Sequence, residues 1–288
     1  MCDYGRQMKH LDLFSGIGGF ALAARRVGWD TIGFCEIDSY CQKVLAKNFP
    51  GVPIHDDVKT YRGTSGDADI VTFGFPCQDL SLAGKQGGID ADRSGLWSEG
   101  CRIVGEVRPS YAVVENVTAL LSGDSGRWFQ RVLGDLAEIG YDCEWHCIPV
   151  SAVGAPHLRD RVWIIAYPQH PDTNSTGSYR EEIDINGNTE QRHQQVRFAR
   201  SMGEFLADAN QPRLERRLRK IMRERTGERT PGQGGSERNG FWSVEPDVGR
   251  VANGVRKRVD RLRGLGNAIV PACAQIIFEA INETNPRN

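Results

Sequence analysis

Apolar and polar positions alternate along the first part of the chain in a way that predicts strands and helices in turn. Short apolar runs predict strands at 10–14, 31–36, 69–74, 111–116 and 161–167. Helical spacing appears between them, from the glycine-rich turn at 15–19 to Val27, over 39–48 and over 128–139. This alternation predicts an α/β fold, a doubly wound, mainly parallel sheet with helices on both faces.

The chain changes character after residue 167. Residues 168–260 are rich in Asn, Thr, Gly, Gln and Arg and poor in long apolar runs, and an apolar helical pattern returns in 261–288. We therefore expect a first domain over 1–167, a small separate region over 168–260, and a C-terminal segment over 261–288 that returns to the first domain. The small region contains one helical pattern, over 212–225. Its apolar face should anchor the helix to the small domain; that face comprises Leu214, Leu218, Ile221 and Met222.

The net charge of −1 conceals an asymmetry between the two parts of the chain. Residues 1–167 carry 16 basic and 21 acidic side chains, a net charge of −5, whereas residues 168–288 carry 20 and 16, a net charge of +4. A basic segment on a near-neutral protein is compatible with a polyanion bound at one face. A solvated, arginine-rich helix explains the excess equally well.

Neither a membrane segment nor a metal site is expected. No apolar run approaches the roughly 20 residues of a membrane span, and the polar N-terminus lacks a signal-peptide core, so we expect a cytoplasmic protein with no membrane partner. None of the eight cysteines forms a CxxC pair, which makes a zinc site improbable.

The ends of the first two predicted strands favour a cofactor that contains adenosine. In DLFSGIGGF (12–20), a strand ends in a glycine-rich turn that lets backbone approach a ligand. Asp12 at the strand end suits an amine or ribose better than a phosphate. Glu36 ends the next strand and can accept two hydrogen bonds from a ribose diol, although it could instead cap the following helix. The turn is not the GxGxxG that a pyrophosphate needs, which disfavours a hydride-transferring enzyme.

Reactive side chains follow the next two strands. Cys77 lies in GFPCQ, after a strand end and a proline and before a polar loop, which argues for an exposed nucleophile over an ordinary core cysteine. Glu115, in ENV, ends the following strand, where burial would raise its pKa and let it donate or accept a proton. Ligands bind at the carboxyl ends of parallel strands, so these loops should line one crevice.

Two arginines lie just before the last predicted strand, in PHLRDRV (156–162). Alternation along a strand puts Arg159 and Arg161 on one side. Either could bind a phosphate or a substrate carbonyl, and an internal ion pair with Asp160 or Glu115 is the alternative interpretation.

Five motifs occur in a fixed order along the chain: DLFSGIGGF, GFPCQ, ENV, RDRV and GLGNAIVP (264–271). Together they resemble the motif set of cytosine-5 DNA methyltransferases, over 1–167 and 261–284. The resemblance implies an S-adenosylmethionine-dependent methyltransferase fold, with catalysis and cofactor binding in 1–167 and target recognition in 168–260. It implies duplex DNA as substrate and a monomeric enzyme. A cognate restriction endonuclease would be a partner that forms no stable complex.

The resemblance also implies a mechanism. Cys77 would attack C6 of a cytosine flipped out of the duplex. Glu115 would hold N3 and the exocyclic amine, Arg161 the O2 atom, and Arg159 would support the thiolate. C5 would then take the methyl group.

Further residues correspond to the family's binding positions. Phe14 matches the aromatic that stacks on adenine, Asp57 the acid that reads the adenine amino group, and Asn267 the residue near the methionine end. The other cofactor positions are Gly16, Gly18, Glu36, Ile37, Val58, Pro76 and Leu96. DNA contacts are expected from the loop residues Gln78, Ser81, Lys85 and Arg93 and from the basic Arg216, Arg217 and Lys220. The family's last helix packs beside the first motif.

The sequence departs from the family's pattern at two places, and two alternative functions stay open. His157 stands where many members have Gln, and the region between Tyr167 and Arg261 is short and shows no specific target-recognition sequence. An RNA cytosine methyltransferase would share the first motif and ENV. A catalytically dead DNA-binding module of the same fold is disfavoured because Cys77, Glu115 and Arg161 are all present.

Overall fold

The computed structural model describes residues 7–75, 95–155, 159–169, 220–221 and 258–284. The region expected to recognise the target, 168–260, therefore lies almost entirely outside the described residues. Of the predicted helix over 212–225, only Lys220 and Ile221 are described. Lys220 is exposed, and Ile221 is buried in a core cluster with residues of the first and last segments. The one described member of the apolar face thus packs against the main domain and not, as expected, within a small one.

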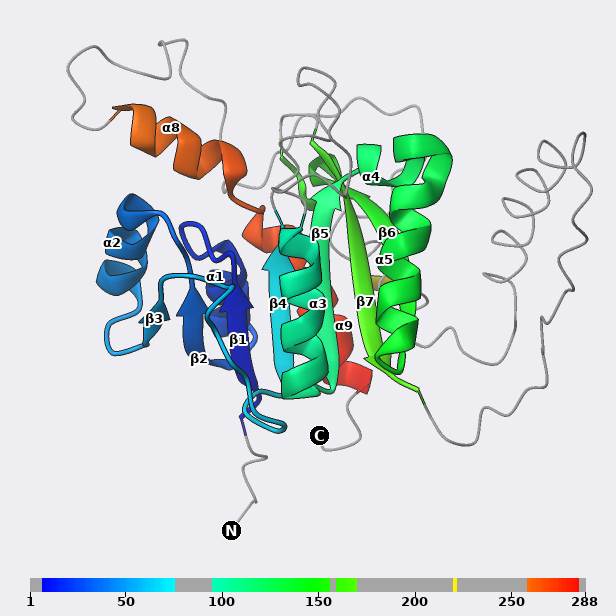
Figure 1. The fold of residues 1–288 in the computed structure, drawn as a ribbon. Coiled ribbons are helices and arrows are strands. Elements are labelled where there is room, and N and C mark those ends of the chain that lie inside the picture. The colour runs from blue at the N-terminus through cyan, green and yellow to red at the C-terminus, as the bar shows by residue number, and fades with distance from the viewer. Residues whose placement is uncertain (1–6, 76–94, 156–158, 170–219, 222–257, 285–288) are drawn as a thin grey trace, which may run out of the picture.

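Within these described ranges, seven strands form one twisted sheet in the order β3-β2-β1-β4-β5-β7-β6 (Figure 1). The first five strands are parallel, and β7 runs antiparallel to both β5 and β6. The sheet is therefore mainly parallel, as predicted. The strands are β1 (Lys9–Leu13), β2 (Asp30–Cys35), β3 (Ile54–His55), β4 (Ile70–Gly74), β5 (Tyr111–Val117), β6 (Tyr141–Pro149) and β7 (Asp160–Pro168).

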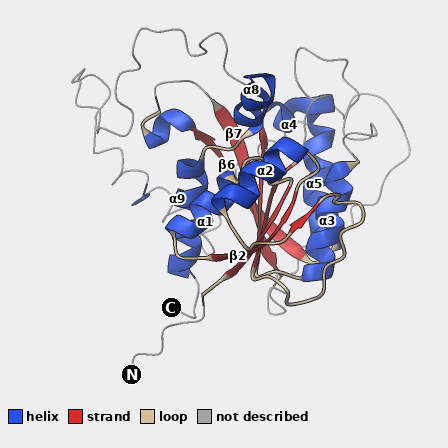
Figure 2. Cartoon of the chain, turned by 90° about the vertical axis from the view of Figure 1, so that its left-hand side faces the viewer, coloured by secondary structure: helices blue, strands red, loops and turns tan. Residues whose placement is uncertain are grey.

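Helices cover both faces of this sheet, which makes three layers (Figure 2). On one face lie α3 and α5, and on the other α1 and α9. The helices are α1 (Gly19–Arg26), α2 (Ser39–Asn48), α3 (Leu96–Val107), α4 (Ala119–Ser122), α5 (Arg127–Glu138), α8 (Arg258–Asn267) and α9 (Pro271–Thr284), with 3-10 turns at Gly123–Gly126 and Val150–Val153.

The last helix closes the core beside the first. Phe278 of α9 stacks on Trp29, with ring centroids 4.4 Å apart, and lies 6.3 Å from the ring of Phe20 in α1. Seven side chains of α9 are buried. The chain's two ends thus build one core, as the resemblance implied for the last helix.

The apolar character of this last segment needs a separate explanation. By length and composition alone, Val259–Thr284 could cross a membrane. Half of its most apolar window is buried inside the fold, however, and Ile277, Phe278 and Ile281 are fully enclosed. The hydrophobicity of α9 is accounted for by its place in the core.

The predicted elements agree closely with the observed ones where the pattern is strong. Each predicted strand begins and ends within a residue of an observed strand, and α2 spans the predicted 39–48. The sequence pattern did not reveal α3, β3 or β6. These omissions matter for the site, because α3 forms one of its walls.

Candidate active site

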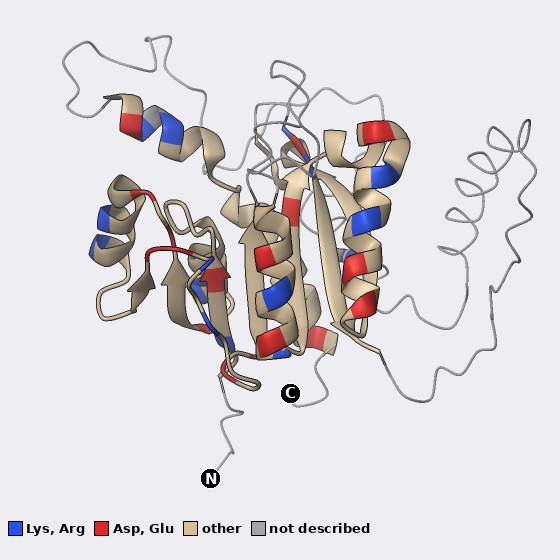
Figure 3. Ribbon diagram, in the orientation of Figure 1, with Lys and Arg blue, Asp and Glu red and all other residues tan. Residues whose placement is uncertain are grey.

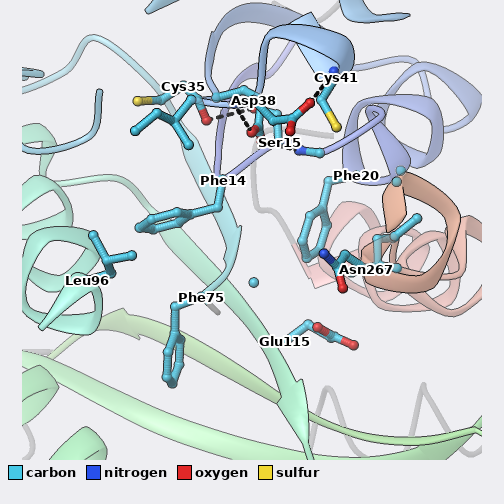
Figure 4. Close-up of a pocket in the computed structure, with 18 of the residues that line it drawn as sticks. Phe14, Ser15, Phe20, Cys35, Asp38, Cys41, Phe75, Leu96, Glu115 and Asn267 are labelled. Atoms are coloured by element: carbon cyan, nitrogen blue, oxygen red, sulfur yellow. Dashed lines mark hydrogen bonds between the residues drawn. The ribbon is translucent and has the colours of Figure 1, made fainter. Parts of the chain in front are cut away.

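A cavity of about 660 Å³ opens at the carboxyl ends of the parallel strands (Figure 4). Its walls come from the loops after β1, β2 and β4, from the end of β5 and from the turn between α8 and α9. The predicted crevice therefore exists. It brings together Phe14, Gly16, Glu36, Ile37, Asp57, Val58, Leu96, Glu115, Arg159, Arg161 and Asn267 from the expected set.

The glycine-rich turn after β1 has a strained backbone at one wall of the cavity. Phe14 and Gly16 have φ values of +49° and +53°. No described atom lies within 4 Å of a Cβ built on Gly16, so its backbone faces open space that a ligand can occupy. Gly18 differs: it does not line the cavity, and a Cβ there would lie 2.8 Å from the ring of Phe49 and 3.0 Å from Leu45. Packing against these two side chains explains Gly18, rather than contact with a ligand.

Glu36 fixes this turn in place. Its carboxylate accepts hydrogen bonds from the backbone N–H of Gly16 at 2.7 Å and of Asp38 at 2.8 Å. Burial raises the pKa of Glu36 above its usual value, although both N–H groups oppose that shift. The helix cap is Asp38, whose side chain accepts from the N–H groups of Tyr40 and Cys41. Glu36 is therefore not the cap that its position allowed.

Asp12 does not face the cavity, contrary to the expectation that it meets a ligand. It is fully buried, accepts a hydrogen bond from Thr72 at 3.3 Å, and has a pKa raised well above its usual value by burial. Beside it, the buried His10 bridges Thr31 and Thr72 at 3.0 and 2.8 Å. These groups support β1 from within the core. Asp12 is buried because β1 is a central strand of the sheet. Helices cover both faces of such a strand, so its side chains are enclosed whichever face they point to.

Another wall of the cavity is formed by the loop after β3 and the start of α3. Asp57, Val58 and Lys59 line the cavity from this loop, and Leu96 lines it from α3. Figure 4 shows Leu96 and Phe14 on the same side of the cavity. Ile37, at the rim, is 76% exposed, an apolar surface that a flat aromatic ligand could cover.

Glu115 lies at the floor of the cavity, facing Arg161. Its Oε1 is 3.0 Å from Nε of Arg161, so the ion pair considered as an alternative is present. Burial is the larger influence and raises the pKa of Glu115, while Arg161 and Arg159 act in the opposite direction. A buried carboxyl with a raised pKa, open to a cavity, is suited to exchange a proton with a bound ligand.

Arg159 links this floor to the C-terminal segment. It donates from Nη2 to the carbonyl of Ala268 at 2.7 Å, next to the cavity-lining Asn267. Its Nε is buried and has no hydrogen-bond partner among the described residues. Burial lowers the pKa of this guanidinium. Arg159 is therefore held in place and retains a donor for another group.

Several predicted site residues lie outside the described residues. The chain reaches the cavity at Gly74 and the buried Phe75, and Cys77 follows two residues later. Cys77 itself is outside the described residues. So are Pro76, Gln78, Ser81, Lys85, Arg93, His157, Arg216 and Arg217. Across the described ranges, no group of three or more His, Cys, Asp or Glu side chains is placed to hold a metal ion.

Sequence reasoning missed one pair at the rim of the cavity. Arg263 of α8 forms an ion pair with Asp38, and both residues line the cavity. Asp38 could have been identified as a helix cap, since it precedes a predicted helix. Its partner is 225 positions away, and no local pattern indicates such a pairing.

The fold and cavity define a doubly wound α/β protein with a ligand site at the strand ends. The family model described as "C-5 cytosine-specific DNA methylase" matches residues 8–239. The chain belongs to this family.

The chain also resembles individual members of the family. The type II methyltransferase M2.BsuMI of Bacillus subtilis is 39% identical over 163 residues, which are 55% of this chain and 42% of that protein. The type II methyltransferase M.HhaI of Haemophilus parahaemolyticus is 34% identical over 160 residues, 56% and 49% of the two chains. The solved structure of S. pombe Dnmt2 methyltransferase is 21% identical, with a TM-score of 0.46, and covers 57% of this chain and 52% of that one. The chain spans about half the length of the curated relatives that it matches.

Proposed function

We propose that this protein transfers a methyl group from S-adenosylmethionine to C5 of cytosine in duplex DNA. The observation that carries the proposal is the cavity itself, in which Glu115 and Arg161 face the turn around Gly16 and Glu36. The family and the type II methyltransferases among its relatives support DNA as the substrate. On the same basis, we propose a cytoplasmic enzyme of a restriction–modification pair.

The cavity residues fit S-adenosylmethionine. Backbone at Gly16 is open to a close approach, and the partly buried carboxylate of Glu36 beside it is an acceptor for a ribose diol. Phe14, Ile37 and Leu96 offer apolar surface for a purine ring, and Asp57 an acceptor for its amino group. Asn267 would lie at the methionine end. When bound, the cofactor supplies an electrophilic methyl group.

The protein's own residues would prepare the cytosine. The thiolate of Cys77 would form a bond to C6 while the electron pair of the C5–C6 double bond moves onto C5. Glu115, whose pKa is raised by burial, would donate a proton to N3 and accept from the exocyclic amine, and Arg161 would hold O2. After C5 takes the methyl group, loss of the C5 proton to a base releases the Cys77 sulfur and restores the double bond. This chemistry needs a base flipped out of the stack.

Expression in a methylation-free host tests the proposal. Base-resolution mapping should reveal 5-methylcytosine in one sequence context of host DNA, and Cys77→Ala should abolish it while folding and cofactor binding persist. A duplex containing 5-fluorocytosine should form a stable adduct that peptide mapping locates at Cys77, because fluorine does not leave as a proton does.

The alternatives predict different results. Methyl incorporation into transfer RNA but not duplex DNA would replace the proposal with an RNA methyltransferase. DNA binding without any transfer would identify a catalytically dead module. An adduct on another cysteine would refute the assignment of the nucleophile.

A further inference from the structure

Arg102, in the middle of α3, has an unusually complete set of partners. Its Nε and Nη1 contact the carboxylates of Glu99 and Glu106, at 2.8 and 2.5 Å. Figure 3 shows basic and acidic residues following one another along this helix. Both ion pairs are partly shielded, since each side chain is 28% exposed. The acidic pair fixes the direction in which the guanidinium points.

The remaining nitrogen of Arg102 reaches across to another element. Nη2 donates to the backbone carbonyls of Val58 at 3.1 Å and Tyr61 at 3.0 Å. Glu106 adds a further link, accepting from the N–H of Gly63 at 2.9 Å. One guanidinium thus contacts the cavity-lining segment 57–59 at Val58 and the chain just after this segment at Tyr61.

The helix that carries Arg102 is itself rigidly seated. Trp97 is buried and donates to Asp135 of α5 at 2.7 Å. At Gly100 the helix backbone lies so close to Phe73 of β4 that an added Cβ would come within 2.6 Å of its ring. Leu96, at the start of the same helix, lines the cavity. Arg102 and Glu106 therefore connect α3, which carries Leu96, to the segment that carries residues 57–59.

We propose that Arg102 is a positioning residue for the cofactor, which sets binding affinity by fixing the 57–59 turn against α3. The inference rests on the proposed function for the identity of the ligand, S-adenosylmethionine. Arg102 acts through Val58 and Asp57. Only a planar group with several donors can make all four contacts at once, and lysine cannot replace it. We call the contacts of Arg102 with Val58 and Tyr61 the brace. Without the brace, the 57–59 turn samples other positions, and each binding event must order the turn again.

Two variants of Arg102 test this inference, Arg102→Met and Arg102→Lys, each compared with Arg127→Ala. Arg127 forms a similar pair with Asp124 but lies on α5 and does not line the cavity. Titration calorimetry should show S-adenosylmethionine binding about tenfold more weakly to both Arg102 variants, as when one charge-assisted hydrogen bond is lost, and unchanged binding to Arg127→Ala. Amide exchange in 57–63 should become faster without ligand in the Arg102 variants only.

A double-mutant cycle separates positioning from general destabilisation. If Arg102 acts by positioning Asp57 and Val58, the variant Asp57→Ala/Arg102→Lys should lose less affinity than the sum of the two single losses. Additive losses, or an unchanged dissociation constant in Arg102→Lys, would overturn the inference. If Arg102→Met does not fold, Arg102→Lys carries the test. If the wild type itself does not bind S-adenosylmethionine, the proposed function fails, whereas unchanged exchange in 57–63 refutes the brace alone.

Discussion

Neighbouring glycines of one turn are required for different reasons. Gly16 and Gly18 both have positive φ, so an alanine at either costs about 1–2 kcal/mol of backbone strain. Only at Gly18 does the new methyl group also collide with Phe49 and Leu45, an overpacking that costs about 1–3 kcal/mol more. We expect Gly18→Ala to lower the free energy of unfolding more than Gly16→Ala, and Gly16→Ala to weaken cofactor binding. Urea unfolding and calorimetry on both variants measure this; equal losses of stability would contradict it.

Glu115 gives the protein a defined pH dependence. Its pKa is raised in the folded state, so the folded protein binds this proton more tightly than the unfolded chain does. The stability it contributes is fully present below the usual pKa of 4.5 and is lost as pH rises through the folded-state value. The difference in unfolding free energy between wild type and Glu115→Gln should therefore shrink or reverse from pH 4.5 upward. Urea titrations across that range measure it. A difference that grows with pH would mean that the Arg161 ion pair outweighs burial.

At the scale of the elements, an ion pair between Arg263 and Asp38 connects α8, which lines the cavity, to the start of α2. Asp38→Asn keeps the helix cap through Oδ1 but removes the charge that pairs with Arg263. Exposed pairs contribute up to about 1 kcal/mol, so we expect cofactor affinity to fall about two- to fivefold with little change in global stability. Arg263→Ala should have the same effect, and the double variant no more. Calorimetry and amide exchange over 258–268 measure it, and a stronger effect in the double variant would exclude a simple pair.

The elements also show what a sequence pattern can and cannot predict. The central strands were predictable because both faces are covered, so their sequences are continuous apolar runs. By contrast, β6 forms an edge of the sheet, most of its side chains are only partly buried, and YDCEWHCIP shows no such run. In α3, Trp97, Cys101 and Val104 have helical spacing, but Gly100 and Gly105 lower helix propensity. The residues at the cavity floor could be predicted because they lie at strand ends. The contacts of Arg102 and Arg263 could not, because they join segments that are distant in the sequence.

At the scale of the whole molecule, the packing of α9 against α1 joins the two ends of the described chain in one core; we call this contact the seam. Phe278 is fully buried between Trp29 and Phe20, so Phe278→Ala should lower the free energy of unfolding by about 3–5 kcal/mol. That is a large share of the roughly 5–15 kcal/mol available to a domain. Val259, 77% exposed on α8, is the matched control, and Val259→Ala should change stability by less than about 0.5 kcal/mol. Urea unfolding measures both. A loss below about 1 kcal/mol for Phe278→Ala would show that the seam is dispensable.

The position of residues 263–269 in the cavity wall has a consequence for biosynthesis. A ribosome makes the turn around Gly16 first and this wall more than two hundred residues later, although both line one cavity. While the nascent chain lacks Asn267 and α9, the cavity lacks one of its walls and α1 lacks the helix that packs beside it. A prematurely terminated product should therefore carry an incomplete cavity, with the residues before 263 present and the wall formed by 263–269 missing.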